Sequence, residues 1–165
     1  MSGNVAKLTD DLAGADLSRR LAAAETLCRL GAEGREAAVA LVRAASDPDE
    51  SVREFAAGAL EELGAPPAAD CAALAKLLND NHADVVYWAA TLLGRLGPAA
   101  GAAVPALIEV LESNVPSNGR QRAAWALGEI GPAARAALGP LRQTVSSDDK
   151  RLARLAAAAA EKISG

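Results

Sequence analysis

The sequence predicts an all-α solenoid, a stack of helix pairs that repeats along the chain. Glycines recur at Gly31, Gly64, Gly97 and Gly131, so their successive spacings are 33, 33 and 34. A leucine or isoleucine precedes each glycine directly, and an alanine lies eight positions before it. A fixed period in this range is typical of stacked repeat architectures, in which neighbouring units share one core.

Each repeated glycine follows an apolar helix face. Before Gly64, apolar residues recur at i, i+4, i+7, i+8 and i+11 from Val52 to Leu63, which is the period of one face of a helix. The expected helices span residues 5–12, 16–30, 33–45, 47–63, 68–78, 81–96, 102–112, 120–130, 133–145 and 151–163. Four complete pairs with this period are therefore expected, flanked by two half-repeats.

Start and stop signals support these elements in order. Asp16 can cap the second helix, residues 47–50 resemble a capping box with proline at the first helical position, and residues 147–149 can cap the last helix. Prolines at 66–67, 98 and 132 separate the two helices of a pair. The connector 113–119 holds the extra residue of the longer spacing, and Gly139 with Pro140 predicts a delayed or kinked helix.

Composition agrees with thin, closely packed helices in a single domain, residues 1–165. Alanine supplies 42 of the 165 residues, whereas only four residues are aromatic. Alanine is the best helix former and lets helix backbones approach closely. The net charge of −4 argues against a nucleic-acid partner, because such partners favour a basic face. We find no signal or membrane-span pattern, and expect a cytoplasmic protein with no membrane partner.

The repeat pattern resembles the HEAT-like repeat, in the short form found in phycobilin lyase-type proteins. The pattern is Asp-x-x-x-Arg, an alanine run, Ala-Leu-x-x-Leu-Gly, and then Ala-x-x-(Pro)-x-Leu. It matches Asp49, Arg53, Ala56, Ala59, Leu60, Leu63, Gly64, Val104, Pro105, Leu107, Ala123, Ala126, Leu127, Ile130, Gly131 and Pro132. The resemblance implies a right-handed solenoid with first helices on the convex side and second helices on the concave side. It also implies protein partners, while some relatives attach a bilin chromophore and others read damaged DNA.

Two acid–base pairs are predicted to be structural. Asp16 and Arg20, like Asp49 and Arg53, are four residues apart, so they are expected to face one another on a helix or its cap. The resemblance implies that this arginine links neighbouring repeats. Trp88 is expected to pack between repeats.

Two surfaces are candidates for protein binding. Arg43, Lys76, Glu109 and Gln143 each lie twelve residues after a repeated glycine, and this row could form a graded recognition surface on the concave side or serve only solubility. Trp125 is expected about opposite the Ala-Leu face, where it is either a contact hot spot or covered by the connector 113–119.

No catalytic, metal or cofactor site is predicted. His82 is the single histidine and lies in a turn, Cys71 is expected in the core, and Cys28 is expected at the edge of an apolar face. We therefore predict a non-enzymatic scaffold for a protein partner. The alternatives are a phycobilin lyase-like subunit and, with less support, a nucleic-acid-binding protein. The expected state is a monomer, with an end-to-end dimer as the alternative.

Overall fold

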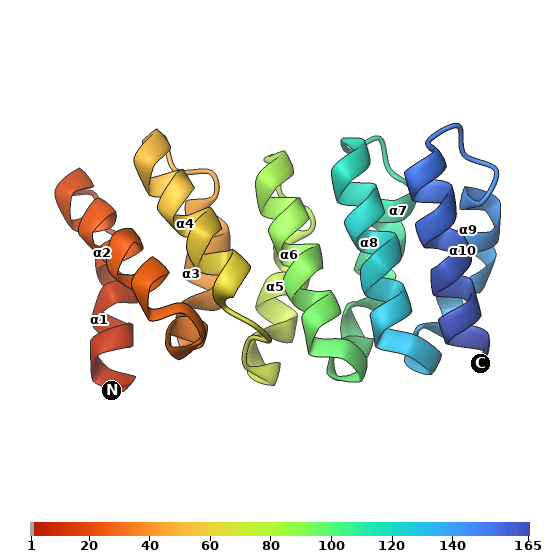
Figure 1. Ribbon diagram of the computed structural model, residues 1–165, viewed down its shortest axis with the longest axis horizontal. Coiled ribbons are helices and arrows are strands. Elements are labelled where there is room, and N and C mark those ends of the chain that lie inside the picture. Colours follow the sequence, from red (N-terminus) through yellow and green to blue (C-terminus); the bar gives the residue numbers. More distant parts are fainter. Residues whose placement is uncertain (1) are drawn as a thin grey trace. The chain divides into compact units, whose positions relative to one another are not determined.

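The computed structural model describes residues 2–165, all of whose regular elements are helices (Figure 1). The α-helices are α1 Ser2–Leu12, α2 Leu17–Leu30, α3 Ala38–Ala44, α4 Glu50–Glu62, α5 Cys71–Leu77, α6 Ala83–Leu96, α7 Val104–Glu112, α8 Ser117–Ile130, α9 Leu138–Thr144 and α10 Lys150–Ser164. Four 3₁₀-helices are interspersed, namely η1 Gly31–Ala37, η2 Ala68–Asp70, η3 Gly97–Ala103 and η4 Gly131–Ala137. In chain order across the described residues, four helix pairs thus follow α1 and precede α10, as predicted for an α-solenoid.

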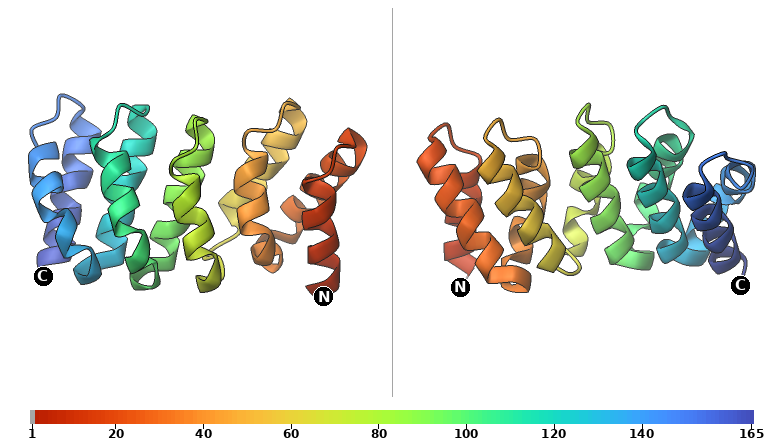
Figure 2. Two further views of the ribbon diagram at one scale, coloured as in Figure 1. Left: turned by 180° about the vertical axis from the view of Figure 1, so that it is seen from behind. Right: turned by 45° about the horizontal axis from the view of Figure 1, so that its top comes forward.

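The chain divides into two compact units, Met1–Asp70 and Cys71–Gly165. In the first unit, α2 packs against α1 and α4, and α3 packs against α4. In the second unit, the first helices α6, α8 and α10 pack side by side, and the second helices α5, α7 and α9 form another layer (Figure 2). The layer of first helices carries the candidate site described below.

The core of each unit is built from leucine and alanine. Leu41, Leu74, Leu107 and Leu141 occupy one position of the second helices and are fully buried. The alanines eight positions before the repeated glycines are also buried, because helices approach closely there. Cys71 is buried as predicted.

The four repeated glycines turn the chain between the helices of each pair. Their φ angles are 51° at Gly31, 73° at Gly64, 58° at Gly97 and 71° at Gly131, and no other described residue has a positive φ. Three of them open a 3₁₀-helix of seven residues, so α3, α7 and α9 begin later than the sequence predicts. The tighter 3₁₀ turn is common next to helix ends. In α9 this delay places Pro140 in the first turn, where a missing N–H costs little.

A second repeated turn precedes each of the helices α4, α6, α8 and α10. A side-chain oxygen of Asp47, Asp80, Ser113 or Ser147 accepts from the backbone N–H two residues later, at 2.9, 2.8, 3.3 and 3.2 Å. The predicted capping role of Asp47 is therefore wrong. Asp49 is the N-cap of α4 and accepts from the Val52 N–H at 3.1 Å, whereas Asp47 shapes the turn before it. The expected cap Asp16 is formed, and of residues 147–149 it is Asp149 that caps α10.

One stretch, residues 83–112, is apolar and long enough to meet a length-and-composition criterion for a membrane span. In the fold it comprises α6, η3 and α7, and the chain turns at Gly97 between the two α-helices. Nine residues of α6 are buried, among them Trp88, Leu92 and Leu93. Packing within the protein therefore accounts for the apolar composition of this stretch.

A candidate protein-binding groove at Trp125

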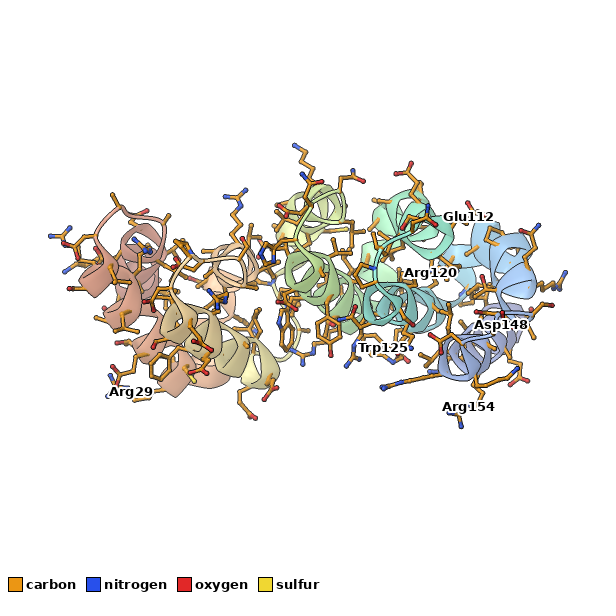
Figure 3. All side chains as sticks on the ribbon, turned by 90° about the horizontal axis from the view of Figure 1, so that it is seen from above. Arg29, Glu112, Arg120, Trp125, Asp148 and Arg154 are labelled. Atoms are coloured by element: carbon orange, nitrogen blue, oxygen red, sulfur yellow. The ribbon has the colours of Figure 1, made fainter. Side chains whose placement is uncertain are left out.

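Trp125 lies on the outer side of α8, away from α7 (Figure 3). Its indole is half-buried because it rests on Gly94 of the neighbouring helix α6. A Cβ atom added to Gly94 would lie 2.8 Å from Cε3 and 2.9 Å from Cη2 of the indole. Only glycine at this position leaves room for the ring. Trp125 is thus supported by α6, and its role in binding a partner stays a prediction.

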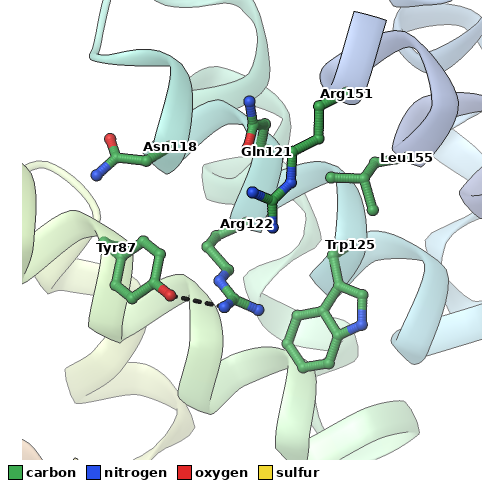
Figure 4. A pocket seen from close by; sticks show the side chains of 7 residues that line it. All are labelled: Tyr87, Asn118, Gln121, Arg122, Trp125, Arg151 and Leu155. Atoms are coloured by element: carbon green, nitrogen blue, oxygen red, sulfur yellow. Dashed lines mark hydrogen bonds between the residues drawn. The ribbon is translucent and has the colours of Figure 1, made fainter.

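The guanidinium group of Arg122 lies between two aromatic rings (Figure 4). Its Cζ atom is 4.8 Å from the ring centroid of Tyr87 and 5.5 Å from that of Trp125. One guanidinium nitrogen donates to the Tyr87 hydroxyl at 2.6 Å. Tyr87 is itself held edge-on against the buried Trp88, with ring centroids 5.2 Å apart. This chain of contacts fixes the position of Arg122.

Arg151 and Leu155 of α10 complete one side of a groove of about 300 Å³, and Asn118 and Gln121 of α8 line its end. Helix period explains the placement, because Gln121, Arg122 and Trp125 share one face of α8, and Arg151 and Leu155 share one face of α10. The groove mixes aromatic rings with charged hydrogen-bond donors. Sites for drug-sized ligands span about 300–1,000 Å³, and this groove lies at the lower end of that range. Its size therefore suits one or two side chains of a partner.

The charge of the groove is positive. Among the described residues that line it, two are arginines and none is a carboxylate. Asp149, which contacts the groove residue Gln121, already accepts from the Ser117 hydroxyl and from the Gln121 amide at 2.9 Å. These two hydrogen bonds, with those from backbone N–H groups of α10, hold the pKa of the Asp149 carboxyl well below its usual range. Asp149 is thus an occupied acceptor that ties α8 to α10.

The row predicted on the second helices lies apart from this groove. Lys76 on α5, Glu109 on α7 and Gln143 on α9 are exposed, and so is Arg43 on α3 of the first unit. Arg43 borders a cavity of about 380 Å³ with Thr9, Asp10 and Arg20. Gln143 borders an open depression with Arg120 and Glu112. In neither cavity do the described lining residues include an aromatic ring.

The predicted acid–base pairs are arranged differently from the expectation. Asp16 and Arg20 do not pair with each other, because Asp16 caps α2 and accepts from the Arg19 N–H at 3.0 Å. Arg20 instead donates to Asp47 at 2.8 Å, in the turn before the next repeat. Its guanidinium also reaches the carbonyl of Ala15 at 2.9 Å.

The second pair repeats this arrangement in part. Asp49 caps α4, and Arg53 donates to the carbonyls of Asp47 and Pro48 at 2.8 and 3.1 Å. A carboxylate at an N-cap is occupied by backbone N–H groups, so the arginine four residues later turns to carbonyl oxygens before the cap. The structural role of these residues stays a prediction.

The residues with potential for covalent or metal chemistry lie outside the groove. Burial raises the pKa of the Cys71 thiol, which disfavours a thiolate nucleophile. Cys28 is half-buried, with its sulfur beside Gly58. His82 is exposed at the start of α6. Within residues 2–165, no cluster of three His, Cys, Asp or Glu side chains could hold a metal ion.

Of the seven residues that line the groove, only Trp125 was predicted from the sequence as a site residue. In the sequence, Arg122 looks like one of several polar residues on a first helix, and Tyr87 has no feature that sets it apart as a site residue. The signal that could have found the site is Gly94, because a glycine inside a helical pattern often marks close approach of another group. Gly94 lies on one repeat and Trp125 on the next, and the indole of Trp125 packs directly on Gly94.

The fold and this surface groove define a helical-repeat protein of the solenoid class. The sequence profile of the HEAT repeats matches residues 5–91 and 71–162. The chain therefore belongs to the HEAT-repeat family, as the resemblance in its sequence indicates. No curated protein matches it.

Solved structures of the same fold include natural and designed arrays. An engineered protein is 24% identical, with a TM-score of 0.68, covering 97% of this chain and 79% of that chain. A designed armadillo repeat protein in complex with the peptide (KR)4 is 18% identical, with a TM-score of 0.69 and coverage of 98% and 82%. The complex of CpcE and CpcF of phycocyanin lyase from Nostoc sp. PCC7120 contains a chain that is 25% identical, with a TM-score of 0.69. That match covers 96% of this chain and 64% of the lyase chain, so this chain spans less than two thirds of it.

Proposed function

We propose that this protein is a non-enzymatic scaffold that binds a protein partner. HEAT and armadillo arrays typically serve as protein-interaction modules, and the neighbours include a repeat protein in complex with a peptide and a complex of two protein subunits. The observation that carries the proposal is the groove at Trp125. Tyrosine, tryptophan and arginine are the residue types enriched at the energetic centres of protein interfaces, and here they converge in one preformed site.

The second-helix face, which the resemblance predicts to be concave, is the alternative binding surface. Its row of Arg43, Lys76, Glu109 and Gln143 offers one polar side chain per repeat. Exposed, flexible side chains of this kind lose more conformational entropy on binding than the fixed Arg122 and Trp125 do. We therefore favour the groove.

A pull-down from lysate of the source organism compares the two surfaces. One variant carries Trp125→Ala, and the other carries Arg43→Ala, Lys76→Glu, Glu109→Lys and Gln143→Ala together. Circular dichroism first verifies that both variants keep the helix content of the wild type. We expect Trp125→Ala to lose a protein that the wild type captures. Loss with the second variant alone would assign binding to the second-helix face, and an unchanged captured set would refute both surfaces.

A chromophore-handling role is the second candidate function, and the similarity to a phycocyanin lyase chain favours it. It predicts that an added bilin shows a red-shifted and tightly held absorbance band. The groove of about 300 Å³ is at the small end for a ligand of drug size or larger. A bilin titration to tens of micromolar decides, because an unchanged bilin spectrum would remove this candidate.

A further inference from the structure

We infer that the groove binds an acidic segment of the partner, in which carboxylates flank an apolar side chain. The inference rests on the proposed function and adds the chemistry of the ligand. It follows from three properties of the groove: two guanidinium groups, an aromatic floor, and described lining residues without a carboxylate.

Arg122 provides a prepared carboxylate site. Its guanidinium is held by the Tyr87 hydroxyl and lies against two rings, so little side-chain freedom remains to be lost on binding. Among the described residues, the Tyr87 hydroxyl is the only group that accepts a hydrogen bond from the Arg122 side chain. The other N–H donors of the Arg122 guanidinium are therefore left for a ligand. A planar guanidinium fork matches the two oxygens of a carboxylate.

Arg151 adds a second positive charge across the groove. Its side chain is exposed, extends toward Gln121 and Arg122 in Figure 4, and has no hydrogen-bond or ion-pair partner among the described residues. Asp149, two residues before it in the chain, accepts from Ser117, Gln121 and the backbone N–H of Arg151. Both guanidinium groups are thus available to an acidic ligand.

Trp125 and Leu155 supply the apolar part of the site. The half-buried indole and the half-buried leucine flank the positive groups, so an apolar side chain of the ligand would lose water against them. A segment that alternates glutamate with leucine or phenylalanine meets both requirements. A basic peptide fails the charge requirement, because it would meet the two arginines.

Nucleic acid is a less suitable anion for this groove. Phosphate backbones favour an extended track of lysine and arginine, whereas the groove holds two arginines on a chain of net charge −4. A single-stranded oligonucleotide therefore serves as a competing arm of the test rather than as the proposed ligand.

The test uses three fluorescein-labelled peptides of matched length, EELEEFEE, QQLQQFQQ and KKLKKFKK, titrated with the intact protein in low salt. We expect fluorescence anisotropy to report binding of the acidic peptide, weakened by added NaCl because screening reduces charge attraction. In a ¹H–¹⁵N spectrum the protein shows two indole signals, from Trp88 and Trp125, and only the Trp125 signal should move. Trp125→Phe assigns the two signals.

Matched variants locate the site. Arg151→Glu is expected to weaken binding of the acidic peptide by about tenfold, which equals about 1.4 kcal/mol. Arg142→Glu on α9 makes the same charge change at an exposed position outside the groove and should change binding by less than about twofold.

Several results would overturn the inference. One is equal affinity of the protein for the acidic and neutral peptides, and another is tighter binding of the oligonucleotide than of the acidic peptide. A third is an equal loss of peptide affinity in Arg142→Glu and Arg151→Glu. The fourth is a Trp125 indole signal that does not move up to about 1 mM peptide. If the acidic peptide fails while the pull-down still depends on Trp125, the ligand chemistry is wrong and the proposed function stands. If the pull-down is also independent of Trp125, the groove itself is refuted as the binding surface.

Discussion

The indole of Trp125 rests on the backbone of Gly94, one repeat earlier in the chain. An equivalent contact joins Cys28 and Gly58, with the large and small residues exchanged. Cys28 and Gly94 lie three residues before a repeated glycine, whereas Gly58 and Trp125 lie six residues before one. A Cβ at Gly58 would lie 3.0 Å from the sulfur of Cys28. At both contacts, a glycine on one repeat accommodates a larger side chain on its neighbour.

Gly94→Ala should displace the indole of Trp125. The added methyl group would overlap the ring, so we expect the indole to move toward solvent and the free energy of unfolding to fall by about 1–2 kcal/mol, after the gain in helix propensity is included. Urea unfolding measures the stability, and the Trp125 indole signal reports the displacement. Unchanged stability together with an unmoved signal would contradict the contact.

Gly139→Ala is the matched control for that variant. Gly139 also lies in a helix, but apart from its chain neighbours and its own helix backbone, a Cβ there would meet no atom within 4 Å. We expect a change in stability of less than about 1 kcal/mol, because the lower entropy of the unfolded chain is offset by crowding between the new Cβ and the ring of Pro140. Loss of stability in both variants would mean that the effect of Gly94→Ala does not come from the indole.

The ion pair between Arg20 and Asp47 should contribute more than a surface pair. The side chains are only 14% and 8% exposed, and the distance is 2.8 Å. A double-mutant cycle with Arg20→Ala and Asp47→Ala should give a coupling of about 1–3 kcal/mol. The pair of Arg19 and Asp11, at 3.7 Å with Arg19 72% exposed, should give less than about 1 kcal/mol. Equal couplings would show that burial adds nothing to the Arg20 pair.

The Asp149 carboxylate should make stability depend on acid pH. Its pKa is lowered in the folded chain, mainly by the Ser117 hydroxyl and then by Gln121, so its charged form is bound more favourably there than in the unfolded chain. The stabilisation is therefore complete above the ordinary value of 3.8 and is lost as the pH falls through the lowered folded-state pKa. Asp149→Ala should lower the Tm at pH 7, and the difference from wild type should shrink below about pH 4.

Asp148→Ala is the control for this titration. Asp148 is the exposed neighbour of Asp149 and forms no described hydrogen bond or ion pair, so its removal should leave the Tm at pH 7 close to that of the wild type. If the two variants follow the same curve, the stabilisation does not come from the contacts of Asp149 with Ser117 and Gln121.

The isolated protein is expected to be a monomer. Exposed polar and charged residues lie on α1 and α10, among them Lys7, Asp10, Arg154 and Glu161, and such surfaces favour contact with water. Light scattering should give a mass near the 16.7 kDa of one chain. A mass twice that of one chain would instead support the end-to-end dimer.

Sequence period was sufficient to predict the fold. The chain adopts a positive φ at the end of each first helix, which favours glycine. The glycines at 31, 64, 97 and 131 therefore marked these helix ends in the sequence. The starts of the second helices were less predictable, because a 3₁₀ turn and an α-helix have similar composition in Gly-Pro-Ala segments. The cap at Asp49 was misplaced by two residues, since both aspartates at 47 and 49 are suitable caps in sequence.

The site was predicted only in part. Trp125 stood out by its rarity and its angular position, but its partners come from three helices whose contact depends on the packing of neighbouring repeats. The cation–π contacts of Arg122 involve Tyr87, 35 residues away, and helix period alone does not fix such a separation. The reach of Arg20 to Asp47, rather than to Asp16, likewise depends on which carboxylate the backbone has already occupied.

The turns at Asp47, Asp80, Ser113 and Ser147 also bear on how such a chain can change its length. They recur with the same period as the glycines, and each uses the same side-chain-to-backbone bond. Excision of residues 48–80 would join Asp47 to Asn81, and an aspartate would still stand two residues before His82. Duplication of residues 48–80 would join Asp80 to Pro48, and an aspartate would again stand two residues before Asp49. Recombination at these turns can therefore lengthen or shorten the array by one unit without a new loop.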